Sequence, residues 1–205
     1  MSEVKKVSIT VLLPSGMLPL EWMAAAQRIA VQYSLRIYLS NAQNLRFIDV
    51  PEDVADTIKA ELQALGCELK GPGKFPIPKV CIGQGHCNLG LIDTEKLSNR
   101  ILEKFSSRAH TKAKFKIAVA ACPLSCSDTK TSDIGIVATR IGFEVFAGGK
   151  GGPFPKVGRR IERNCDEERM LEIIAELVEF HDQKTEQKQR MNKLLDDAEF
   201  PFAEM

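Results

Sequence analysis

Residues 81–87 read CIGQGHC and residues 122–126 read CPLSC, and these two stretches hold four of the six cysteines of the chain. Each stretch contains Gly or Pro and is predicted to be a loop, and glycines at 83 and 85 let the backbone approach a bound group closely. Four thiolates are what a cubane iron–sulfur cluster requires. We therefore expect one [4Fe–4S] cluster, held by Cys81, Cys87, Cys122 and Cys126.

Two other interpretations of the four cysteines remain open at this point. Soft thiolates select zinc as well as iron–sulfur clusters, but the pairs of a structural zinc site are usually separated by two to four residues. The second pair fits that spacing and the first does not. The other alternative is four unrelated buried cysteines, which two pairs on loops make a weak explanation. His86, next to a predicted ligand, is expected to lie near the cluster or in solvent and not to bind it.

The composition is that of a globular protein. The chain has 205 residues, 44% of them hydrophobic, and a formal net charge of +1, so it shows no strongly basic character that would suggest nucleic-acid binding. It contains no apolar run of the roughly 18 residues that a membrane span needs. Residues 1–6 lack the layout of a signal peptide. We expect a cytoplasmic protein whose cysteines are reduced and available for metal binding.

The first 70 residues are predicted to form an α+β domain. Strands are expected over residues 7–13, 35–39 and 45–50, and helices over residues 20–33 and from Pro51 to a C-cap at Gly66. A last short strand near residues 67–69 would complete a small ferredoxin-like sandwich.

Residues 71–205 are predicted to form a second α+β domain with C-terminal helices. Residues 70–80 contain three prolines and two glycines and suggest a linker. A helix capped by Asp93 should run to about Phe105. Strands are expected over residues 115–121, 134–138 and 143–147, followed by an irregular glycine loop at 148–153. A helical tail should extend from Asp166 to about Leu195.

The cysteine pattern and its surroundings resemble the siroheme-dependent sulfite and nitrite reductases. The spacing C-x5-C followed by Cys-Pro-x-x-Cys is similar to the cluster motif of that family. The flanking segments agree with it: Lys114-Phe-Lys116 before the second pair, Ile134-Gly135 after it, the Phe146-Ala-Gly-Gly149 loop, and the Gln43-Asn44 turn. The larger family members contain two such halves, so this chain resembles the compact type with one half.

This resemblance implies siroheme in addition to the cluster, with the Cys126 thiolate bridging the two. It implies a reductase that transfers several electrons to a small oxyanion, sulfite or nitrite, from a low-potential donor such as a ferredoxin. Lys114 and Lys116 alternate with Phe115 on a predicted strand, so both should point to one face and contact the substrate or a siroheme carboxylate. The other residues expected to contact the cofactor are Gln43, Asn44, Lys150, Arg159 and Arg160. Because the family is built from two related halves, a chain with one half is expected to form a homodimer.

One position departs from the family pattern. The turn before the glutamine usually carries threonines and an arginine in that family, and here it reads Ser40-Asn41-Ala42. Arg36 or Arg46, on the neighbouring strands, could supply the missing charge. The departure keeps a second function open, an electron-transfer or cofactor-handling iron–sulfur protein without siroheme catalysis. A zinc-stabilised interaction module is the third.

Overall fold

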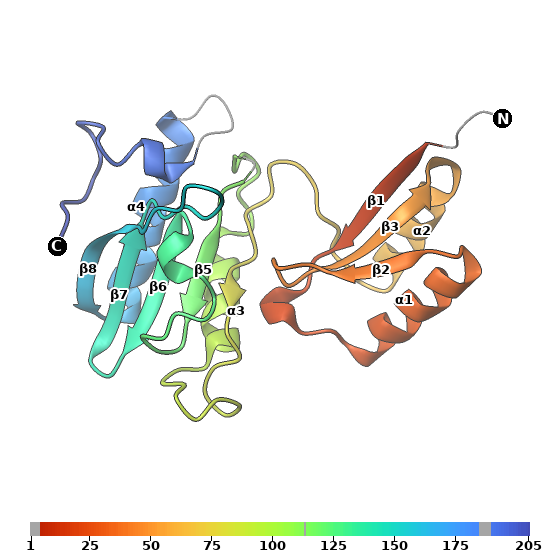
Figure 1. The fold of residues 1–205 in the computed structure, drawn as a ribbon, viewed down its shortest axis with the longest axis horizontal. Coiled ribbons are helices and arrows are strands. Elements are labelled where there is room, and N and C mark those ends of the chain that lie inside the picture. Colours follow the sequence, from red (N-terminus) through yellow and green to blue (C-terminus); the bar gives the residue numbers. More distant parts are fainter. Residues whose placement is uncertain (1–4, 113, 185–189) are drawn as a thin grey trace. The chain divides into compact units, whose positions relative to one another are not determined.

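A computed structural model of the chain describes residues 5–112, 114–184 and 190–205 (Figure 1). The chain divides into two compact units, Met1–Gly71 and Pro72–Met205. Within the described ranges, no helix is long and apolar enough to cross a membrane. Helices and sheets are mixed in both units, which confirms the predicted α+β class.

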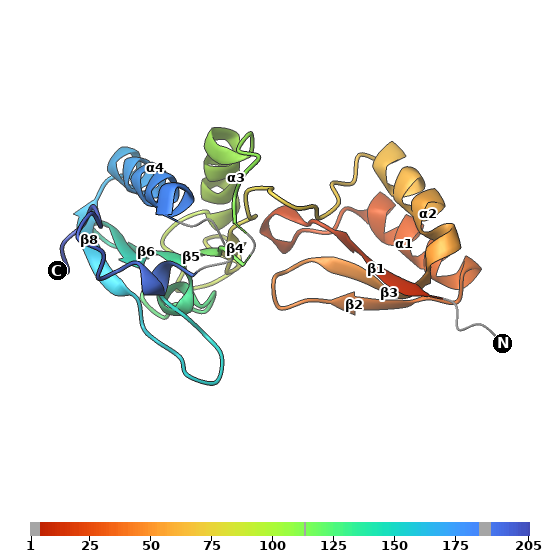
Figure 2. The same cartoon turned by 90° about the horizontal axis from the view of Figure 1, so that it is seen from above.

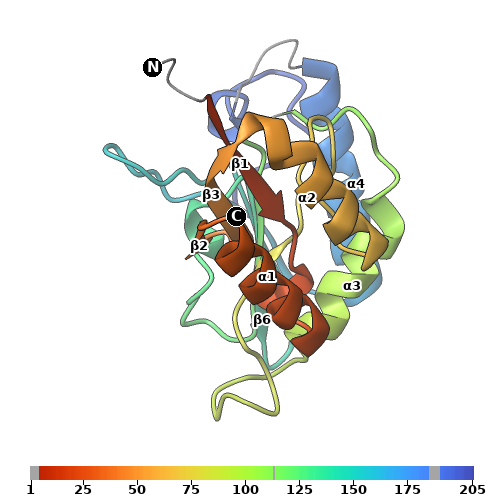
Figure 3. The ribbon, with the colours of Figure 1, turned by 90° about the vertical axis from the view of Figure 1, so that its right-hand side faces the viewer.

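The first unit is a three-stranded antiparallel sheet with two helices on one face. The strand order is β1-β3-β2. Its elements are β1 (Lys6–Val11), η1 (Pro14–Gly16), α1 (Leu20–Gln32), β2 (Arg36–Leu39), β3 (Leu45–Pro51) and α2 (Glu52–Ala64). The two helices lie side by side (Figure 3), and an ion pair between Arg28 and Glu61 joins them. Ile29, Phe47 and Ile58 are fully buried between helices and sheet.

The end of this unit follows the prediction in part. Gly66 adopts φ +79°, and its N–H donates to the Gln63 carbonyl at 2.9 Å, as expected of a helix C-cap. The predicted last strand is reduced to a single antiparallel bridge between Val11 and Leu69. The Leu12 N–H, which donates to the Glu68 carbonyl at 2.8 Å, supports this bridge.

The second unit is built on a five-stranded mixed sheet in the order β4-β5-β6-β7-β8. β4, β5 and β6 are parallel, and β7 and β8 continue the sheet antiparallel. Helices α3 and α4 cover one face (Figure 2). The elements are β4 (Lys79–Val80), α3 (Thr94–Phe105), β5 (Ile117–Ala120), η2 (Thr129–Thr131), β6 (Ile134–Thr139), β7 (Gly142–Ala147), β8 (Arg159–Cys165), α4 (Glu167–Lys184) and η3 (Met191–Lys193).

The two faces of this sheet are packed differently. Ile117 and Ile136 belong to the same buried cluster as Ile101 of α3 and Ile173 of α4. The opposite face carries small residues such as Gly135, where an added Cβ would lie 1.9 Å from the Thr129 carbonyl oxygen. The backbone of η2 therefore rests directly on β6, and it belongs to the segment that follows the second cysteine pair.

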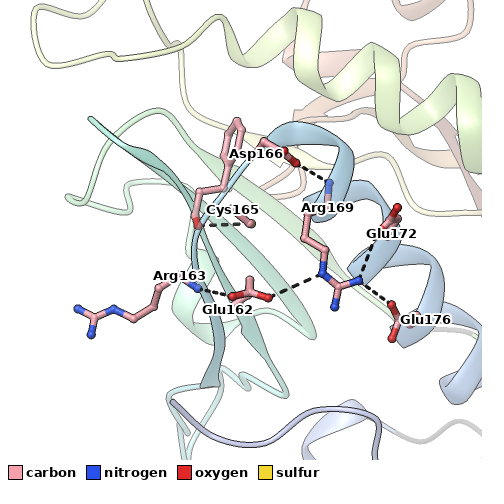
Figure 4. A network of polar contacts seen from close by, with 8 residues as sticks. Glu162, Arg163, Cys165, Asp166, Arg169, Glu172 and Glu176 are labelled. Carbon is pink, nitrogen blue, oxygen red and sulfur yellow. Dashed lines mark hydrogen bonds and ion pairs between the residues drawn. The ribbon is translucent and has the colours of Figure 1, made fainter.

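The junction between β8 and α4 is held by polar contacts (Figure 4). The Asp166 carboxylate accepts the Arg169 N–H at 2.8 Å and caps α4. The Arg169 guanidinium contacts Glu162, Glu172 and Glu176 at 3.8, 3.1 and 3.0 Å. Cys165 lies at the end of β8, and its thiol donates to the Phe143 carbonyl at 3.5 Å.

Several expectations for this unit need correction. The supposed linker contains β4, and β8 was not predicted. The strand expected from Phe115 begins only at Ile117. The C-terminal helix is described as far as Lys184, and the described residues 190–195, expected to be helical, are not α-helix. The part of that predicted helix over residues 185–189 lies outside the described residues. After them the chain forms a short 3-10 turn, η3.

Candidate metal centre

The carboxyl ends of β4 and β5 carry the first cysteine of each pair. The two strands are parallel, with Val80 opposite Val119, so their ends lie at the same edge of the sheet. Cys81 follows β4 directly, and Cys122 follows β5 after Ala121. The Ala121 N–H donates to the Cys81 sulfur at 3.2 Å. The Cys81 sulfur is therefore held against the backbone of Ala121, the residue just before Cys122.

The loop that carries Cys87 is pinned at both ends. The Thr94 hydroxyl donates to the Cys81 carbonyl at 2.6 Å, and the Leu91 N–H donates to the Ala121 carbonyl at 2.9 Å. The Cys87 N–H donates to the Gly83 carbonyl at 3.0 Å. Gly83 has φ +72°, and an added Cβ would lie 2.6 Å from the Thr94 hydroxyl. Only glycine fits this close turn.

The loop that carries Cys126 folds back over the same edge. Ser125 adopts φ +57°, and its N–H donates to the Cys122 carbonyl at 3.2 Å. The buried Ser127 hydroxyl donates to the Val119 carbonyl at 2.6 Å. Asp128 forms an ion pair with Lys79 of β4 at 2.5 Å. These contacts hold the loop of Cys126 against β5 and against β4, the strand that precedes Cys81.

Burial separates the four paired cysteines from the two single ones. Cys87 and Cys126 are exposed, and Cys81 and Cys122 are partly exposed. Cys67 and Cys165 are buried in the two apolar cores. Burial raises the pKa of Cys67, with a further contribution from Glu21, and burial raises the pKa of Cys165 to about 11. The single cysteines are therefore held as neutral thiols.

The donor set fits an iron–sulfur cluster. Accessible thiols lie on two tightly turned loops at one sheet edge, and one sulfur already accepts a backbone N–H. Hydrogen bonds to the sulfurs are among the features that tune such clusters. In the parts of the chain that the structure describes, no three His, Cys, Asp or Glu side chains converge as ligands of one metal ion. A cubane cluster presents a different requirement, because each thiolate binds a different iron of an inorganic core.

The predicted lysine pair lies outside β5. Lys114 adopts φ +75°, and the Lys116 N–H donates to the Asp133 carboxylate at 2.9 Å instead of to a neighbouring strand. The prediction that Lys114 and Lys116 lie on a strand is therefore wrong. Both side chains are exposed. Phe115 between them is buried against His181, with ring centroids 4.7 Å apart, and anchors the segment.

The arginines after the glycine loop already have partners within the chain. Arg159 donates to the Leu195 carbonyl at 2.7 Å and pairs with Asp196. Arg160 pairs with Glu144 at 3.4 Å. Lys150 lies in the glycine loop, where its backbone N–H donates to the Lys156 carbonyl at 2.8 Å. Both arginines are therefore engaged within the chain, although the buried Nε atom of Arg160 has no hydrogen-bond partner among the described residues.

In the first unit, Gln43 and Asn44 form the turn between β2 and β3. Gln43 adopts φ +59°, and an added Cβ at Gly16 would lie 3.3 Å from its side chain. The Asn44 side-chain oxygen accepts the Leu13 N–H at 3.1 Å, and the residue is buried. Asn44 therefore holds this turn against the end of β1.

The two arginines near this turn differ in their surroundings. Arg36 pairs with Asp49 at 2.6 Å, and this hydrogen-bonded pairing lowers the pKa of the Asp49 carboxyl. Arg46 lies on the central strand between Thr10 and Tyr38, facing away from the core side of β3. Its Nε atom is buried and has no hydrogen-bond partner among the described residues. Side-chain alternation along β3 could have marked Arg46 from the sequence, because Leu45 and Phe47 are the apolar neighbours.

Comparison with protein families matches both units. Residues 77–200 match the nitrite and sulphite reductase 4Fe-4S domain, and residues 2–65 match the nitrite/sulfite reductase ferredoxin-like half domain. Members of the family with this domain use a [4Fe–4S] cluster and siroheme. The predicted resemblance and the predicted cofactors are confirmed at the level of the family.

Individual relatives agree with this assignment. A protein of Emericella nidulans named nitrite reductase (NAD(P)H) is 25% identical over 192 residues, which are 92% of this chain and 17% of that protein. A protein of Nitratidesulfovibrio vulgaris named sulfite reductase, assimilatory-type, is 22% identical over 185 residues, covering 89% of this chain and 84% of that protein.

Among solved structures, the NirA protein of Mycobacterium tuberculosis has the same fold, with a TM-score of 0.74 and 21% identity. The alignment covers 91% of this chain and 37% of that one. The chain spans only 17% of the length of the Emericella nidulans protein. Since the two family models together cover nearly all of the sequence, this chain belongs to the nitrite and sulfite reductase family.

Proposed function

We propose that this protein reduces a small oxyanion, sulfite or nitrite, at a siroheme coupled to a [4Fe–4S] cluster. The observation that carries the proposal is the parallel pairing of β4 with β5, which brings two cysteine loops to one sheet edge. Cys81, Cys87, Cys122 and Cys126 would hold the cluster, and Cys126 would share its thiolate with the siroheme iron. When bound, these groups would pass electrons from an external low-potential donor to the substrate.

The residues of the chain would bind and orient the charged partners. Lys114 and Lys116 would attract the substrate anion, and Lys150 would contact a siroheme carboxylate. Ile82, Leu89 and Leu124 flank the cysteines and are more than half exposed, at 57%, 58% and 65%. Apolar side chains at this position would exclude water from a bound cluster or macrocycle, because they are the neighbours of the ligand thiols.

Arg46 is the candidate to supply the positive charge that an arginine of the turn provides in the family and that Ala42 lacks. Its Nε atom is buried and has no hydrogen-bond partner in the part of the chain that the structure describes, and a buried guanidinium donor is costly when left unsatisfied. Thr10 and Tyr38 stand directly opposite on the two neighbouring strands. Arginine recognises a planar carboxylate through paired N–H donors, so a siroheme carboxylate is a suitable partner.

The electron donor and the assembly are part of the same proposal. We infer a low-potential donor such as a ferredoxin, and a homodimer in which two chains take the place of the two halves of larger family members. Measuring the turnover of each anion would distinguish sulfite from nitrite as the substrate, since both anions would use the same lysines.

An anaerobic absorption spectrum with iron, zinc and sulfide analysis tests the proposal. The full chain would be produced in cells that make siroheme, beside Cys126→Ser and the matched control Cys165→Ser. Porphyrin-type bands with about five irons per chain, four in the cluster and one in the siroheme, are expected for wild type and the control. Cys126→Ser should lose the siroheme bands.

Two other outcomes would point elsewhere. About four irons per chain without porphyrin bands would favour the electron-transfer or cofactor-handling function, which the alanine at position 42 and the internally paired arginines 159 and 160 support. A sample with zinc and no iron would contradict both and leave the zinc-stabilised interaction module.

A further inference from the structure

One carboxylate of the second unit is completely buried. Asp133 lies just before β6 and has no exposed surface. Its carboxylate accepts the Lys116 N–H at 2.9 Å, the Met191 N–H at 3.0 Å and the Arg190 Nε–H at 2.8 Å. A buried charge persists when it is paired and hydrogen-bonded, and Asp133 meets both conditions. We call Asp133 and Arg190 with their bonded partners the Asp133 junction.

The Asp133 junction joins three segments that are distant in the sequence. Lys116 belongs to the lysine segment before β5, and Arg190 begins the C-terminal segment. The third is the start of the glycine loop. The Gly148 N–H donates to the Asp133 carbonyl at 2.8 Å, and Arg190 donates to the Gly149 carbonyl at 3.1 Å. One ion pair therefore contacts both segments that carry the proposed anion-binding lysines.

The lysine segment adopts a backbone conformation that needs support. Lys114 has φ +75°, an unusual value for a residue with a side chain. Such a conformation persists when the surrounding structure determines it, and such conformations concentrate at binding sites. The glycine loop is instead closely packed, since an added Cβ at Gly149 would lie 2.5 Å from the Lys130 carbonyl oxygen. The junction bonds the Lys116 and Gly148 amides, which lie two residues from Lys114 and Lys150 in the sequence.

We propose that Arg190 acts through Asp133 as a positioning residue, which sets Lys114, Lys116 and Lys150 for binding oxyanion groups. The inference rests on the proposed function, since the oxyanion is a siroheme carboxylate or the substrate itself. Arginine suits the position because its planar group bonds Asp133 and the Gly149 carbonyl together, whereas a lysine ammonium cannot reproduce that fork. Nothing local in the sequence marks Asp133 or Arg190, because their roles arise from contacts across the fold.

Arg190→Lys tests the proposal, with Arg169→Lys as the matched control. Arg169 also joins two segments of the second unit, through Glu162 of β8 at 3.8 Å and Glu176 of α4 at 3.0 Å, and no bond joins it to Asp133 among the described residues. The first readout is hydrogen exchange of the full chain at the Lys116 and Gly148 amides. We expect exchange at these amides to become about tenfold faster in Arg190→Lys and to stay unchanged in Arg169→Lys.

The second readout uses the cofactor-loaded protein. Arg190→Lys should raise KM for sulfite or nitrite about tenfold with kcat within about twofold of wild type, because a displaced lysine weakens binding of the anion. The siroheme content should fall by a similar factor if Lys150 binds a carboxylate. A rise in KM alone identifies the substrate as the oxyanion concerned, and a loss of siroheme identifies the cofactor carboxylate. If Arg190→Lys does not fold, Arg190→Gln retains a donor and replaces it.

Three results would overturn the proposal. The first is equal hydrogen exchange in the two variants. The second is faster exchange in Arg190→Lys with KM and siroheme content unchanged, which would leave the junction a structural element alone. The third is an equal change of KM and siroheme content in both variants. If wild type itself takes up no siroheme and turns over neither anion, the proposed function fails, and the exchange data still decide whether Arg190 holds the two segments.

Discussion

At the scale of single residues, the cysteines that are paired in the sequence and the two that stand alone have different environments. The four paired cysteines lie on accessible loops and the two single ones in apolar cores. Short-range spacing could identify this difference because the loops are local features with Gly, Pro and Ser at the turns. The basic residues could not be placed in the same way. The neighbours of Arg159, Arg160 and Lys116 come from distant segments.

Cys165 should make the folded state sensitive to alkaline pH. Burial raises its pKa to about 11 from an ordinary value of 9.0. A raised folded-state pKa gives stability that is fully present below pH 9 and is lost as the pH rises toward 11, since the unfolded thiol ionises first. The loss should be at most about 2–3 kcal/mol. Urea unfolding at pH 8 and pH 10.5 should show a larger loss in wild type than in Cys165→Ala, because the raised pKa of Cys67 is common to both proteins. An equal loss in both would contradict the assignment.

Arg46 should matter more than Arg36 for siroheme retention. Replacement of Arg46 by Gln removes the charge on the central strand, whereas Arg36 is already paired with Asp49. We expect about a tenfold weaker retention of siroheme for Arg46→Gln, equal to about 1.4 kcal/mol. The ratio of porphyrin absorbance to protein measures it. Equal retention in Arg46→Gln and Arg36→Gln would exclude the role of Arg46.

At the scale of elements, the sequence predicts those with strong local signals. The apolar periodicity of α1, α2 and α3 is visible, and Asp93 caps α3 by accepting the Lys96 N–H at 3.0 Å. The missed strands lack such signals. β4 has only two residues, and β8 reads RRIERNC, with four charged side chains. Its place at the edge of the sheet explains this composition, because edge strands carry charge without burying it.

The contact between η2 and β6 should not tolerate a side chain. In Gly135→Ala the new Cβ would lie 1.9 Å from the Thr129 carbonyl oxygen, so the backbone after Cys126 must move. We expect a loss of about 1–3 kcal/mol in unfolding free energy and a lower cluster content. Gly151→Ala is the control, because its Cβ would meet no atom within 4 Å. Thermal unfolding and iron analysis of both variants compare them, and equal melting temperatures would refute the close contact.

At the scale of the whole molecule, one chain carries one ferredoxin-like half domain and one 4Fe-4S domain. The sequence predicts these two parts because each has its own apolar pattern, with a proline- and glycine-rich stretch between them. It does not predict the bonds of the C-terminal segment, such as the Met205 N–H to the Arg160 carbonyl at 2.8 Å. That segment is polar and irregular, and its position depends on the finished sheet.

Self-association is the prediction that belongs to this scale. We expect the cofactor-loaded protein to have twice the mass of the 22.7 kDa chain. Closed pairs are the commonest assembly of identical chains, and a pair would restore the two halves of larger relatives. Light scattering under anaerobic conditions measures the mass. A monomeric mass for protein that retains siroheme would contradict this prediction and would show that a single chain is enough to bind siroheme.

The short pairing of β4 with β5 also bears on how the protein matures. The pair closes a segment of roughly 40 residues, and closing a loop costs chain entropy that grows slowly with length. A two-residue strand offers few bonds against that cost. A cluster bridging the two loops would act as a cross-link, restricting the unfolded chain much as a disulfide does. We expect cluster insertion and closure of this sheet edge to be one cooperative event, so that a chain without iron opens first at β4.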